Sequence, residues 1–454
     1  MSDGKRESVN PTKQAGETHL GRGEGADLPT KADDRWGWVE HSVWNPRMLS
    51  ALKRGVKGGK WFSLIDKIYS LENLASAYAQ VARNRGAAGV DRQSVAQFSR
   101  HLESQLAKLH AKLKNDCYKP SDVLRCWIDK PGSKDKRPLG IPTVRDRVVQ
   151  TALRNVLEPI FEHDFHDRSF GFRPGRGCKD ALREVDRLLK AGYTWVVDAD
   201  IKGYFDSIPH DALIKQVEEK ISDGRVLKLI RQFLKQGIMD EMKRWVPEEG
   251  TPQGAVISPL LSNIFLDPLD KLMSKHGYEM IRYADDFVVM CRSESEAQQA
   301  LHNIRQWMEA NGLQLHPEKT RLVDATQRGG FDFLGYHFER GKKWPRLKSM
   351  KKLKATLSKL TKRNSGKSLK LIISNINPTL RGWFGYFKHS HWNVFPGVDG
   401  WVRMRLRSIN RKRRGGRGRG RGKDHQRWPK LYFERLGLYS LTKAHARLLN
   451  PVTR

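Results

Sequence analysis

Two adjacent carboxylates between two apolar runs constrain the fold of this 454-residue chain more than any other feature. Residues 281–291 read IRYADDFVVMC. Two apolar segments of strand length with a short break between them predict a β-hairpin, whose tip carries Asp285 and Asp286. Hairpin turns more often carry Asn-Gly or Asp-Gly. Because hard divalent cations prefer carboxylate and phosphate oxygens, a rigid hairpin with two carboxylates at its tip is typical of a metal site.

The charge balance indicates a polyanionic partner. Lys and Arg outnumber Asp and Glu by 84 to 50, for a formal net charge of +34, and neutralising phosphates releases counterions. An anionic membrane surface is the main rival, but no stretch approaches the roughly 20 apolar residues of a membrane span. The N-terminus lacks the apolar core of a signal peptide. The four cysteines are too far apart for a zinc site. We interpret them as reduced thiols, which are typical of a cytoplasmic protein. No association with a membrane is expected.

The chain divides by texture into five segments, and the predicted fold class is α+β. Residues 1–45 are assigned to a disordered N-terminal tail, most clearly the polar residues 1–34, and 46–115 to a helical extension. Residues 116–340 mix strands and helices, with helices expected near 210–235, 258–275 and 295–311, and strands near 193–201, 313–323 and 331–338. Residues 341–410 are helical, and 411–454 form a basic segment whose Gly-Arg run predicts flexibility. An antiparallel sheet with helices on one face follows from this order.

A third acid completes a constellation suited to nucleotidyl transfer. Asp200 ends the apolar strand that contains Trp195 and Val197, where it could face the hairpin tip across a sheet. Two metals held by shared carboxylates clamp the attacking and leaving oxygens of an in-line displacement. A Tyr-x-Asp-Asp string alone would arise by chance in roughly a few such chains per hundred. The strand-end Asp upstream, the intervening Pro-Gln-Gly loop and the basic chain make a solvated turn a poor alternative.

Several ordered motifs resemble the reverse transcriptases encoded by bacterial group II introns, which are also splicing maturases. They read RPLGIPTVRDRVVQ, SFGFRPGRG, DADIKGYFDSIPHD, GTPQGAVISPLLSNIFLDPLD, RYADDFVVM, LHPEKT and FDFLGYHF, between residues 137 and 338. INPTLRGWFGYFK at 376–388 resembles the maturase segment. The resemblance implies a right-hand polymerase with fingers and a palm at 116–340 and a helical thumb and maturase domain at 341–410. It also implies a bacterial, cytoplasmic protein that could associate with the nucleoid.

The resemblance implies roles for individual residues. Two Mg²⁺ ions, or Mn²⁺ in their place, would be held by Asp200, Asp285 and Asp286 with the backbone carbonyl of Ile201. Two neighbouring acids, Asp198 and Asp206, could be mistaken for ligands. Phe205 would lie under the incoming sugar, where its ring favours deoxynucleotides. The remaining nucleotide contacts would be Gln253, Lys319, Arg137 and a lysine of the preceding loop, Lys130 with Lys134 or Lys136 as alternatives.

The basic C-terminal part is expected to bind RNA through phosphate contacts and stacking on aromatic or Arg planes. Between 401 and 407, apolar residues alternate with arginines, which we interpret as one buried and one cationic face. The predicted RNA-binding residues are Arg381, Arg403, Arg405, Arg407, Arg411, Lys412, Arg413 and Arg414.

The leading hypothesis is an RNA-directed DNA polymerase that uses deoxynucleotides, an intron RNA template and a DNA primer or target, and that assists intron splicing and mobility. Many members end in an endonuclease domain with paired C-x-x-C motifs, which this sequence lacks, so a form without that domain is expected. One alternative is an RNA-binding splicing factor with a vestigial polymerase. Another is a host-adopted reverse transcriptase in repair or phage defence.

Overall fold

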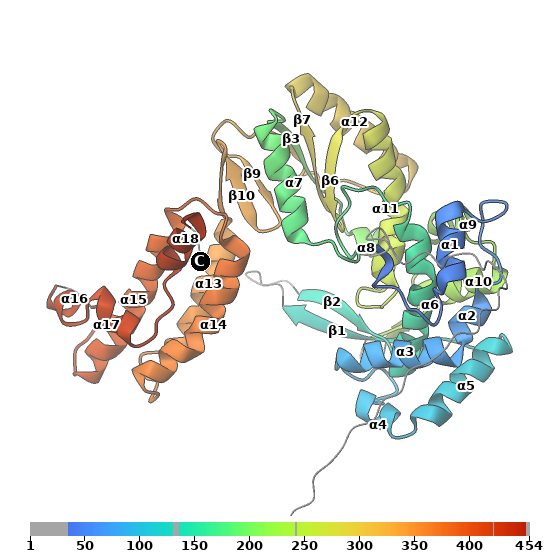
Figure 1. Cartoon of the computed structure of the whole chain (residues 1–454), viewed down its shortest axis with the longest axis horizontal. Coiled ribbons are helices and arrows are strands. Elements are labelled where there is room, and N and C mark those ends of the chain that lie inside the picture. Colours follow the sequence, from blue (N-terminus) through green and yellow to red (C-terminus); the bar gives the residue numbers. More distant parts are fainter. Residues whose placement is uncertain (1–34, 130–135, 241–242, 421, 451–454) are drawn as a thin grey trace, which may run out of the picture. The chain divides into compact units, whose positions relative to one another are not determined.

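The computed structural model describes residues 35–129, 136–240, 243–420 and 422–450 (Figure 1). By its internal contacts the chain separates into two units, residues 1–39 and 40–454. The predicted tail at 1–34 lies outside the described residues. Every helix and strand named below belongs to the second unit.

The second unit begins with an ordered segment and a group of helices. The predicted tail extends too far, because Trp44 is fully buried and its indole Nε1 donates to the carbonyl of Asn155 at 2.9 Å. This bond ties the start of the helical extension to the long helix α6, with which α2 and α3 are in contact. The helices are α1 (Pro46–Arg54), α2 (Ile65–Tyr69), α3 (Leu71–Arg83), α4 (Val95–Ser99), α5 (Leu102–Lys114) and α6 (Val144–Glu162).

Between α5 and α6 lies the hairpin of a four-stranded sheet, here called the fingers sheet. Its order is β2-β1-β4-β5, with β1 antiparallel to β2 and parallel to β4. The β1–β2 hairpin projects away from the helical extension (Figure 1). The strands are β1 (Val123–Asp129), β2 (Lys136–Ile141), β4 (Ile238–Asp240) and β5 (Lys243–Trp245).

A second four-stranded sheet, here called the palm sheet, contains the acidic hairpin, with β6 as its edge strand and β7 beside it. Its order is β6-β7-β3-β8, and every neighbouring pair is antiparallel. This confirms the α+β class with an antiparallel sheet. The strands are β3 (Trp195–Asp200), β6 (Glu279–Tyr283), β7 (Asp286–Cys291) and β8 (Arg321–Asp324).

Helices pack against both faces of the palm sheet, whereas the sequence predicted one. Val196, Val288 and Met290 share a core with the buried side of α7 (Cys178–Lys190). The alternate positions, Val197 and Val289, are also fully buried, and successive strand side chains point to opposite faces. α12 (Glu294–Ala310), which contacts β3, β7 and β8, therefore lies on the second face. The remaining palm helices are α8 (Tyr204–Ser207), α9 (His210–Glu218), α10 (Gly224–Leu234) and α11 (Ser258–Lys275).

Three predicted elements differ from those observed. The helix expected at 210–235 is two helices, because Asp223 ends the break between them and caps α10 by accepting from the amides of Arg225 and Val226. The strand expected at 313–323 is confined to β8. The strand expected at 331–338 is a hairpin turned at Leu334 and Gly335, both with positive φ, in a sheet of β9 (Phe331–Phe333), β10 (Tyr336–Glu339) and β11 (Lys342–Pro345).

Three long helices form the thumb, α13 (Leu347–Leu360), α14 (Leu369–Phe387) and α15 (Val394–Arg413). Two reciprocal tyrosine bonds join it to the β9–β10 hairpin. Tyr336 donates to the carbonyl of Tyr386, and Tyr386 donates to the carbonyl of Leu334, each at 2.6 Å. Phe387 also enters the palm core.

The C-terminal segment from 411 is part of the thumb fold and not a separate tail. Its helices α16 (Lys423–Arg427), α17 (Lys430–Arg435) and α18 (Leu441–Leu449) contribute Trp428, Phe433 and Leu441 to the thumb core. Asp399 on α15 accepts from the amides of Leu441 and Thr442 at 3.0 and 3.1 Å. The Gly-Arg run, expected to be flexible, is also bonded, since Arg411 Nε donates to the Arg417 carbonyl at 2.8 Å.

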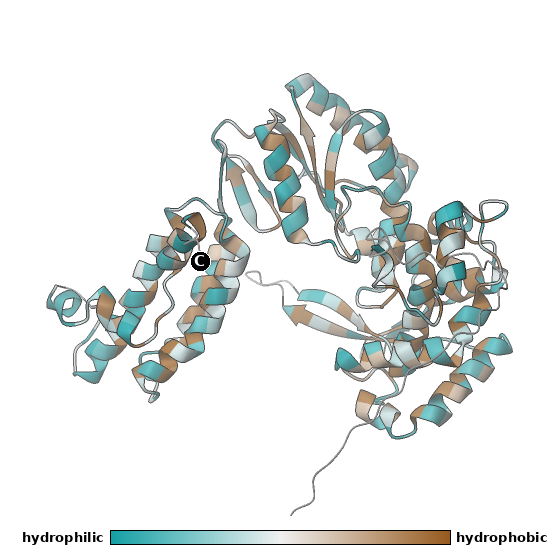
Figure 2. Cartoon of the chain, viewed as in Figure 1, coloured by the Kyte–Doolittle hydropathy of each residue, from teal (hydrophilic) through white to brown (hydrophobic). Residues whose placement is uncertain are grey.

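The helices are two-sided. In Figure 2 both α7 and α12 carry hydrophilic and hydrophobic residues, and the buried residues of α7 are Ala181, Leu182, Val185 and Leu188. This pattern is that of helices packed on a sheet. Among the residues that the structure describes, no helix has the length and apolar character needed to cross a membrane.

Candidate active site

Strand pairing brings the three predicted aspartates to one end of the palm sheet. In the register of β3 and β7, Asp200 lies directly opposite Asp286. Tyr283 pairs with Asp286 across the tight turn that contains Ala284 and Asp285. Asp198 lies two residues before Asp200, so it shares that face of the strand. The sheet thus gathers acids that are about 85 positions apart in the sequence.

A buried arginine, Arg282, stabilises the turn that contains Ala284 and Asp285. Arg282 is fully buried, and its guanidinium binds both carboxylate oxygens of Asp270 on α11. Its Nη1 donates to Asn263 Oδ1 and to the carbonyl of Ala284, each at 2.9 Å. Ala284 has φ +61°, a conformation that residues other than glycine rarely adopt. The Arg282 bond to its carbonyl therefore stabilises an unfavourable turn.

The loop at 169–173 packs against the same turn. Phe170 N donates to the carbonyl of Arg282 at 2.8 Å, and Arg282 N donates to that of Arg168 at 3.0 Å. A Cβ added at Gly171 would lie 2.1 Å from the backbone nitrogen of Ala284. Only glycine allows this approach, so the SFGFRPGRG motif is required where it meets the hairpin.

The carboxylates of the site are partly buried and repel one another. Burial, reinforced by the charges of Asp198, Asp285 and Asp200, raises the pKa of Asp286 to about 7. Burial likewise raises the pKa of Asp285, with Asp200 adding to the effect and Arg137 opposing it. Burial also raises the pKa of Asp198. A cluster of carboxylates in which the charged forms are this disfavoured is suited to a bound cation.

Basic side chains neutralise part of this charge. Lys319 forms an ion pair with Asp200, and Arg321 Nε lies 3.1 Å from Asp198 Oδ2. Arg137, on the fingers strand β2, faces the site closely enough to oppose the rise in the pKa of Asp285. Within the described part of the chain, no three His, Cys, Asp or Glu side chains are arranged so that they could hold a metal ion as they stand. Lys319 holds Asp200 instead.

The Pro-Gln-Gly loop joins the palm to the fingers beside these acids. The carbonyl of Gln253 accepts from the amide of Gly140 on β2 at 2.6 Å. At Gly254, where φ is +108°, an added Cβ would lie 2.4 Å from the Gly140 carbonyl oxygen, so glycine is needed. The Gln253 side chain donates to Asp206 Oδ2 at 3.1 Å.

Phe205 lies on the one-turn helix α8, directly after β3. Gly203, with φ +59°, turns the chain after the strand. Thr251 N of the Pro-Gln-Gly loop donates to the Phe205 carbonyl at 2.6 Å, so the loop that carries Gln253 is tied to Phe205. The Phe205 side chain is half-buried. Ile201, whose carbonyl was a predicted metal ligand, is buried and bridged to Leu315.

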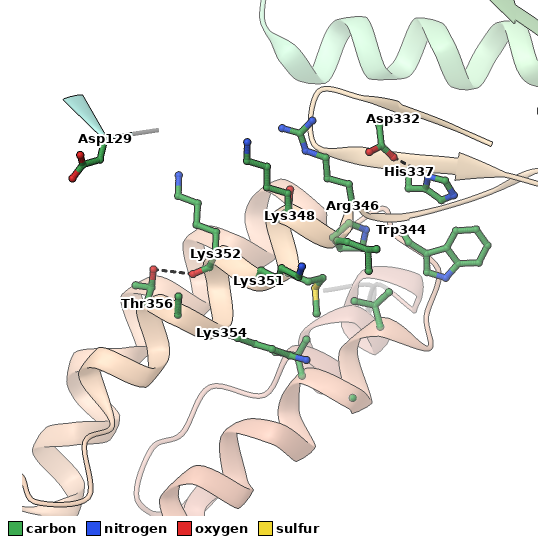
Figure 3. A pocket seen from close by; sticks show the side chains of 18 of the residues that line it. Asp129, Asp332, His337, Trp344, Arg346, Lys348, Lys351, Lys352, Lys354 and Thr356 are labelled. Carbon is green, nitrogen blue, oxygen red and sulfur yellow. Dashed lines mark hydrogen bonds and ion pairs between the residues drawn. The ribbon is translucent and has the colours of Figure 1, made fainter. Parts of the chain in front are cut away.

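A large cleft opens beside the acids. It has a volume of about 2190 Å³ and is lined by the fingers strands, the β9–β11 hairpins and the thumb helix α13. Figure 3 shows Lys348 and Lys352 extending to the same side of α13 as Arg346. Arg137 and Arg321 also line the cleft. Arg321 connects the cleft to the acids, because it pairs with Asp198. A strongly cationic wall next to the acids fits a bound polyanion.

Some predicted binding residues do not stand where the sequence suggested. Lys130 and its alternative Lys134 lie outside the described residues, whereas Lys136 is the exposed first residue of β2. The proposed division of 401–407 into a buried and a cationic face is wrong, because alternation separates faces in a strand and α15 is a helix. Arg407 is buried and donates to the Trp428 carbonyl at 2.9 Å.

Three further arginines of that set bind within the thumb. Arg405 donates to the Thr361 hydroxyl and carbonyl, each at 3.0 Å. Arg411 pairs with Asp424 at 2.5 Å, and the exposed Arg413 donates through Nη2 to the Lys367 carbonyl. The side chains that remain accessible are Arg381, Lys412, Arg413 and Arg414, with Arg403 half-buried.

Sequence reasoning missed the residues that support the acids. Arg282, Asp270 and Asn263 act through one buried network, and no spacing in the sequence links β6 to α11. The one available signal was a charged residue, Arg282, inside an apolar strand, since an unpaired buried arginine is rarely tolerated.

Comparison with known proteins agrees with this architecture. The model of the reverse transcriptase (RNA-dependent DNA polymerase) family matches residues 128–338, and that of the group II intron maturase-specific domain matches 350–428. The second match crosses the boundary predicted at 410, as does the thumb core. The fold is the right-hand polymerase fold, with fingers, palm and thumb.

Two curated relatives and one solved structure illustrate the similarity. The group II intron-encoded protein LtrA of Lactococcus lactis subsp. cremoris is 42% identical over 199 residues, which are 43% of this chain and 33% of LtrA. YkfC of Escherichia coli K12 is 34% identical over 318 residues, 61% of this chain and 83% of YkfC. A chain of a partial Cas6-RT-Cas1–Cas2 complex is 26% identical, covering 55% of this chain and 41% of that one, with a TM-score of 0.36.

The match spans about a third of the length of LtrA but most of YkfC. The two family models follow one another along the chain, the first over the fingers and palm and the second over the thumb. On these matches, the chain belongs to the group II intron-encoded reverse transcriptases that are also maturases.

Proposed function

We propose that this protein is an RNA-directed DNA polymerase that also binds group II intron RNA and assists splicing and intron mobility. The observation that carries the proposal is the register of β3 and β7, which sets Asp200 opposite Asp286 beside Asp285. The cationic cleft next to these acids supports a nucleic-acid substrate, and family membership supports RNA as the template.

Asp200, Asp285 and Asp286 would hold the divalent metal ions that polymerases of this family require, with the Ile201 carbonyl as an additional ligand. Mg²⁺ fits an all-oxygen donor set best, and Mn²⁺ would fit the same set. When bound, the ions would favour the ionised primer 3′-hydroxyl and neutralise phosphate charge. The raised pKa of Asp286 supports this fit, because burial and the neighbouring carboxylates disfavour its charged form, which a bound cation would stabilise.

The surrounding side chains would position the nucleotide. Arg137 would bind its phosphates as a planar fork, together with a lysine from the 130–136 region. Lys319 would leave Asp200 when metal arrives and stabilise the leaving group. Gln253 would exchange its bond with Asp206 for one with the nucleotide, next to Phe205.

Primer extension tests the polymerase directly. A DNA primer annealed to an RNA template is incubated with dNTPs, Mg²⁺ and the wild-type protein or Asp285→Ala. Extension by the wild type alone is expected. RNA binding without any extension by the wild type would instead favour the splicing-factor alternative, and extension by the variant would refute the metal assignment.

Replacing Phe205 by Val should admit ribonucleotides. A smaller side chain under the sugar leaves room for a 2′-hydroxyl, so selectivity for dNTPs over rNTPs should fall by about 10²-fold. The ratio of kcat/KM values for dCTP and CTP, measured by single-nucleotide incorporation, checks this. An unchanged ratio would show that Phe205 does not select the sugar.

The exposed cations at the end of α15 should contribute to RNA affinity. Changing Lys412, Arg413 and Arg414 to Gln removes three charges that the structure leaves accessible. Removing one phosphate-binding cation lowers the slope of log K against log salt by about 1, so a reduction of up to about 3 is expected for intron RNA. Arg405→Gln is the internal comparison, since its side chain is half-buried and its guanidinium donates to Thr361, whereas the three changed side chains are exposed. Equal slopes for wild type and triple variant would exclude these cations from the interface.

A further inference from the structure

Phe172 has a strained backbone and an exposed aromatic side chain beside the site. Its φ is +59° and its side chain is 47% exposed. A left-handed conformation is a genuine outlier for a bulky residue. Such strain persists only where neighbouring structure enforces it, and it concentrates at functional sites.

Residues on both sides enforce this conformation. On one side, Gly171 packs against Ala284, and its carbonyl accepts from Asn263 Nδ2 at 2.8 Å. On the other, the buried guanidinium of Arg173 binds both carboxylate oxygens of Glu162 at 2.8 Å and the Ser169 carbonyl at 2.7 Å. Because both neighbours are fixed, Phe172 cannot relax by moving the loop.

The strained backbone directs the ring toward Phe205. The two rings meet edge to face, with centroids 6.5 Å apart and planes at 75°. Phe205 also contacts Tyr204 at 5.5 Å, and Tyr204 is fixed by its bond to the Ser262 carbonyl at 2.7 Å. The Phe205 ring is therefore contacted by one aromatic from its own helix and one from the loop at 169–173.

We propose that Phe172 is a positioning residue for sugar selection, which holds the Phe205 ring where it excludes a 2′-hydroxyl. The proposal rests on the role given to Phe205 above. A steric test depends on a ring that does not move, and displacement by about 1 Å is enough to alter such a geometry. Without the Phe172 ring, the loop at 169–173 no longer holds the Phe205 ring, which is then freer to rotate.

The test measures the dCTP to CTP ratio of kcat/KM in single-nucleotide incorporation by the full chain. Phe172→Ala should lower the ratio about 3- to 10-fold, the value of one aromatic pair, while Phe172→Tyr, which keeps the ring, should retain it. Phe172→Gly should lower the ratio equally and yet raise the melting temperature, because glycine relieves the positive φ. A purely structural role would move stability and selectivity in the same direction.

A double-mutant cycle separates this proposal from the role of Phe205. If Phe172 acts through Phe205, Phe172→Ala should have no further effect on the ratio in a Phe205→Ala background. A normal ratio in Phe172→Ala with a reduced ratio in Phe205→Ala would overturn the proposal alone. A normal ratio in both would overturn both assignments. A rise only in the KM for primer and template would also overturn it, because Phe172 would then contact the duplex. Phe62→Ala, an exposed ring in the helical extension, is the control.

Discussion

Replacing Asp286 by Asn should abolish DNA synthesis and yet stabilise the metal-free protein at pH 8. Loss of a carboxylate that holds metal should lower primer extension on the order of 10³-fold or more, since charge stabilisation supplies most of the rate in phosphoryl chemistry. The stability gain arises because the wild-type Asp286 carboxylate must ionise where it is buried and next to Asp198, Asp285 and Asp200.

The pH dependence of this stability difference follows from the pKa of Asp286, which is about 7 in the folded protein and so lies above the ordinary value of 3.8. The folded protein holds this proton more tightly than the unfolded chain, so stability falls as pH rises from about 4 to 7. Asp286→Asn should therefore melt above the wild type at pH 8, and the difference should shrink toward pH 5. Thermal melts with EDTA and with Mg²⁺ measure the metal-free and the metal-bound protein, and Mg²⁺ should stabilise the wild type more than Asp286→Asn.

The control is Glu309→Gln, which changes an exposed carboxyl on α12. Equal melting temperatures for Asp286→Asn and wild type at pH 8 would contradict the electrostatic account.

Replacing Arg282 by Met should cause the largest loss of stability among these variants. It leaves the Asp270 carboxylate, itself 2% exposed, without its partner, and removal of one member of a buried ion pair costs about 3–5 kcal/mol. Adding Asp270→Leu should recover most of this loss, because the unpaired charge is removed as well. Urea unfolding measures both changes.

Activity should not recover with stability. In the double variant the Ala284 carbonyl still lacks its donor, so the turn bearing Asp285 is less well held, and primer extension should stay at least about 10-fold below wild type. Arg231→Met removes an arginine from an exposed pair with Glu218, and it should cost no more than about 1 kcal/mol. Full activity in the refolded double variant would show that Arg282 only stabilises the fold.

The sequence predicted much of the site because its chemistry is local. The hairpin of β6 and β7 follows from two apolar runs around Asp285 and Asp286. The helix at 258–275 was predicted at its observed bounds. Period and turn chemistry depend on adjacent residues, so they can be read without the fold.

Two of the failures have a common cause. The burial of Trp44 and the docking of α16–α18 both depend on partners more than 40 positions away. The break between α9 and α10 is different, because it coincides with a local cap at Asp223 that the helical period masked. The prediction that the arginines of α15 bind RNA was only partly accurate for a related reason. The sequence does not show which arginine will bond to Asp424 or to the Trp428 carbonyl within the thumb.

The sequence by itself determined the acids, the family motifs and the excess of positive charge. Only the tertiary structure decided that Asp200 lies opposite Asp286, that Arg282 supports their turn and that Phe172 meets Phe205. The physical reason is that pairing register, burial and side-chain contact are properties of two segments brought together, whereas a motif records only one of them.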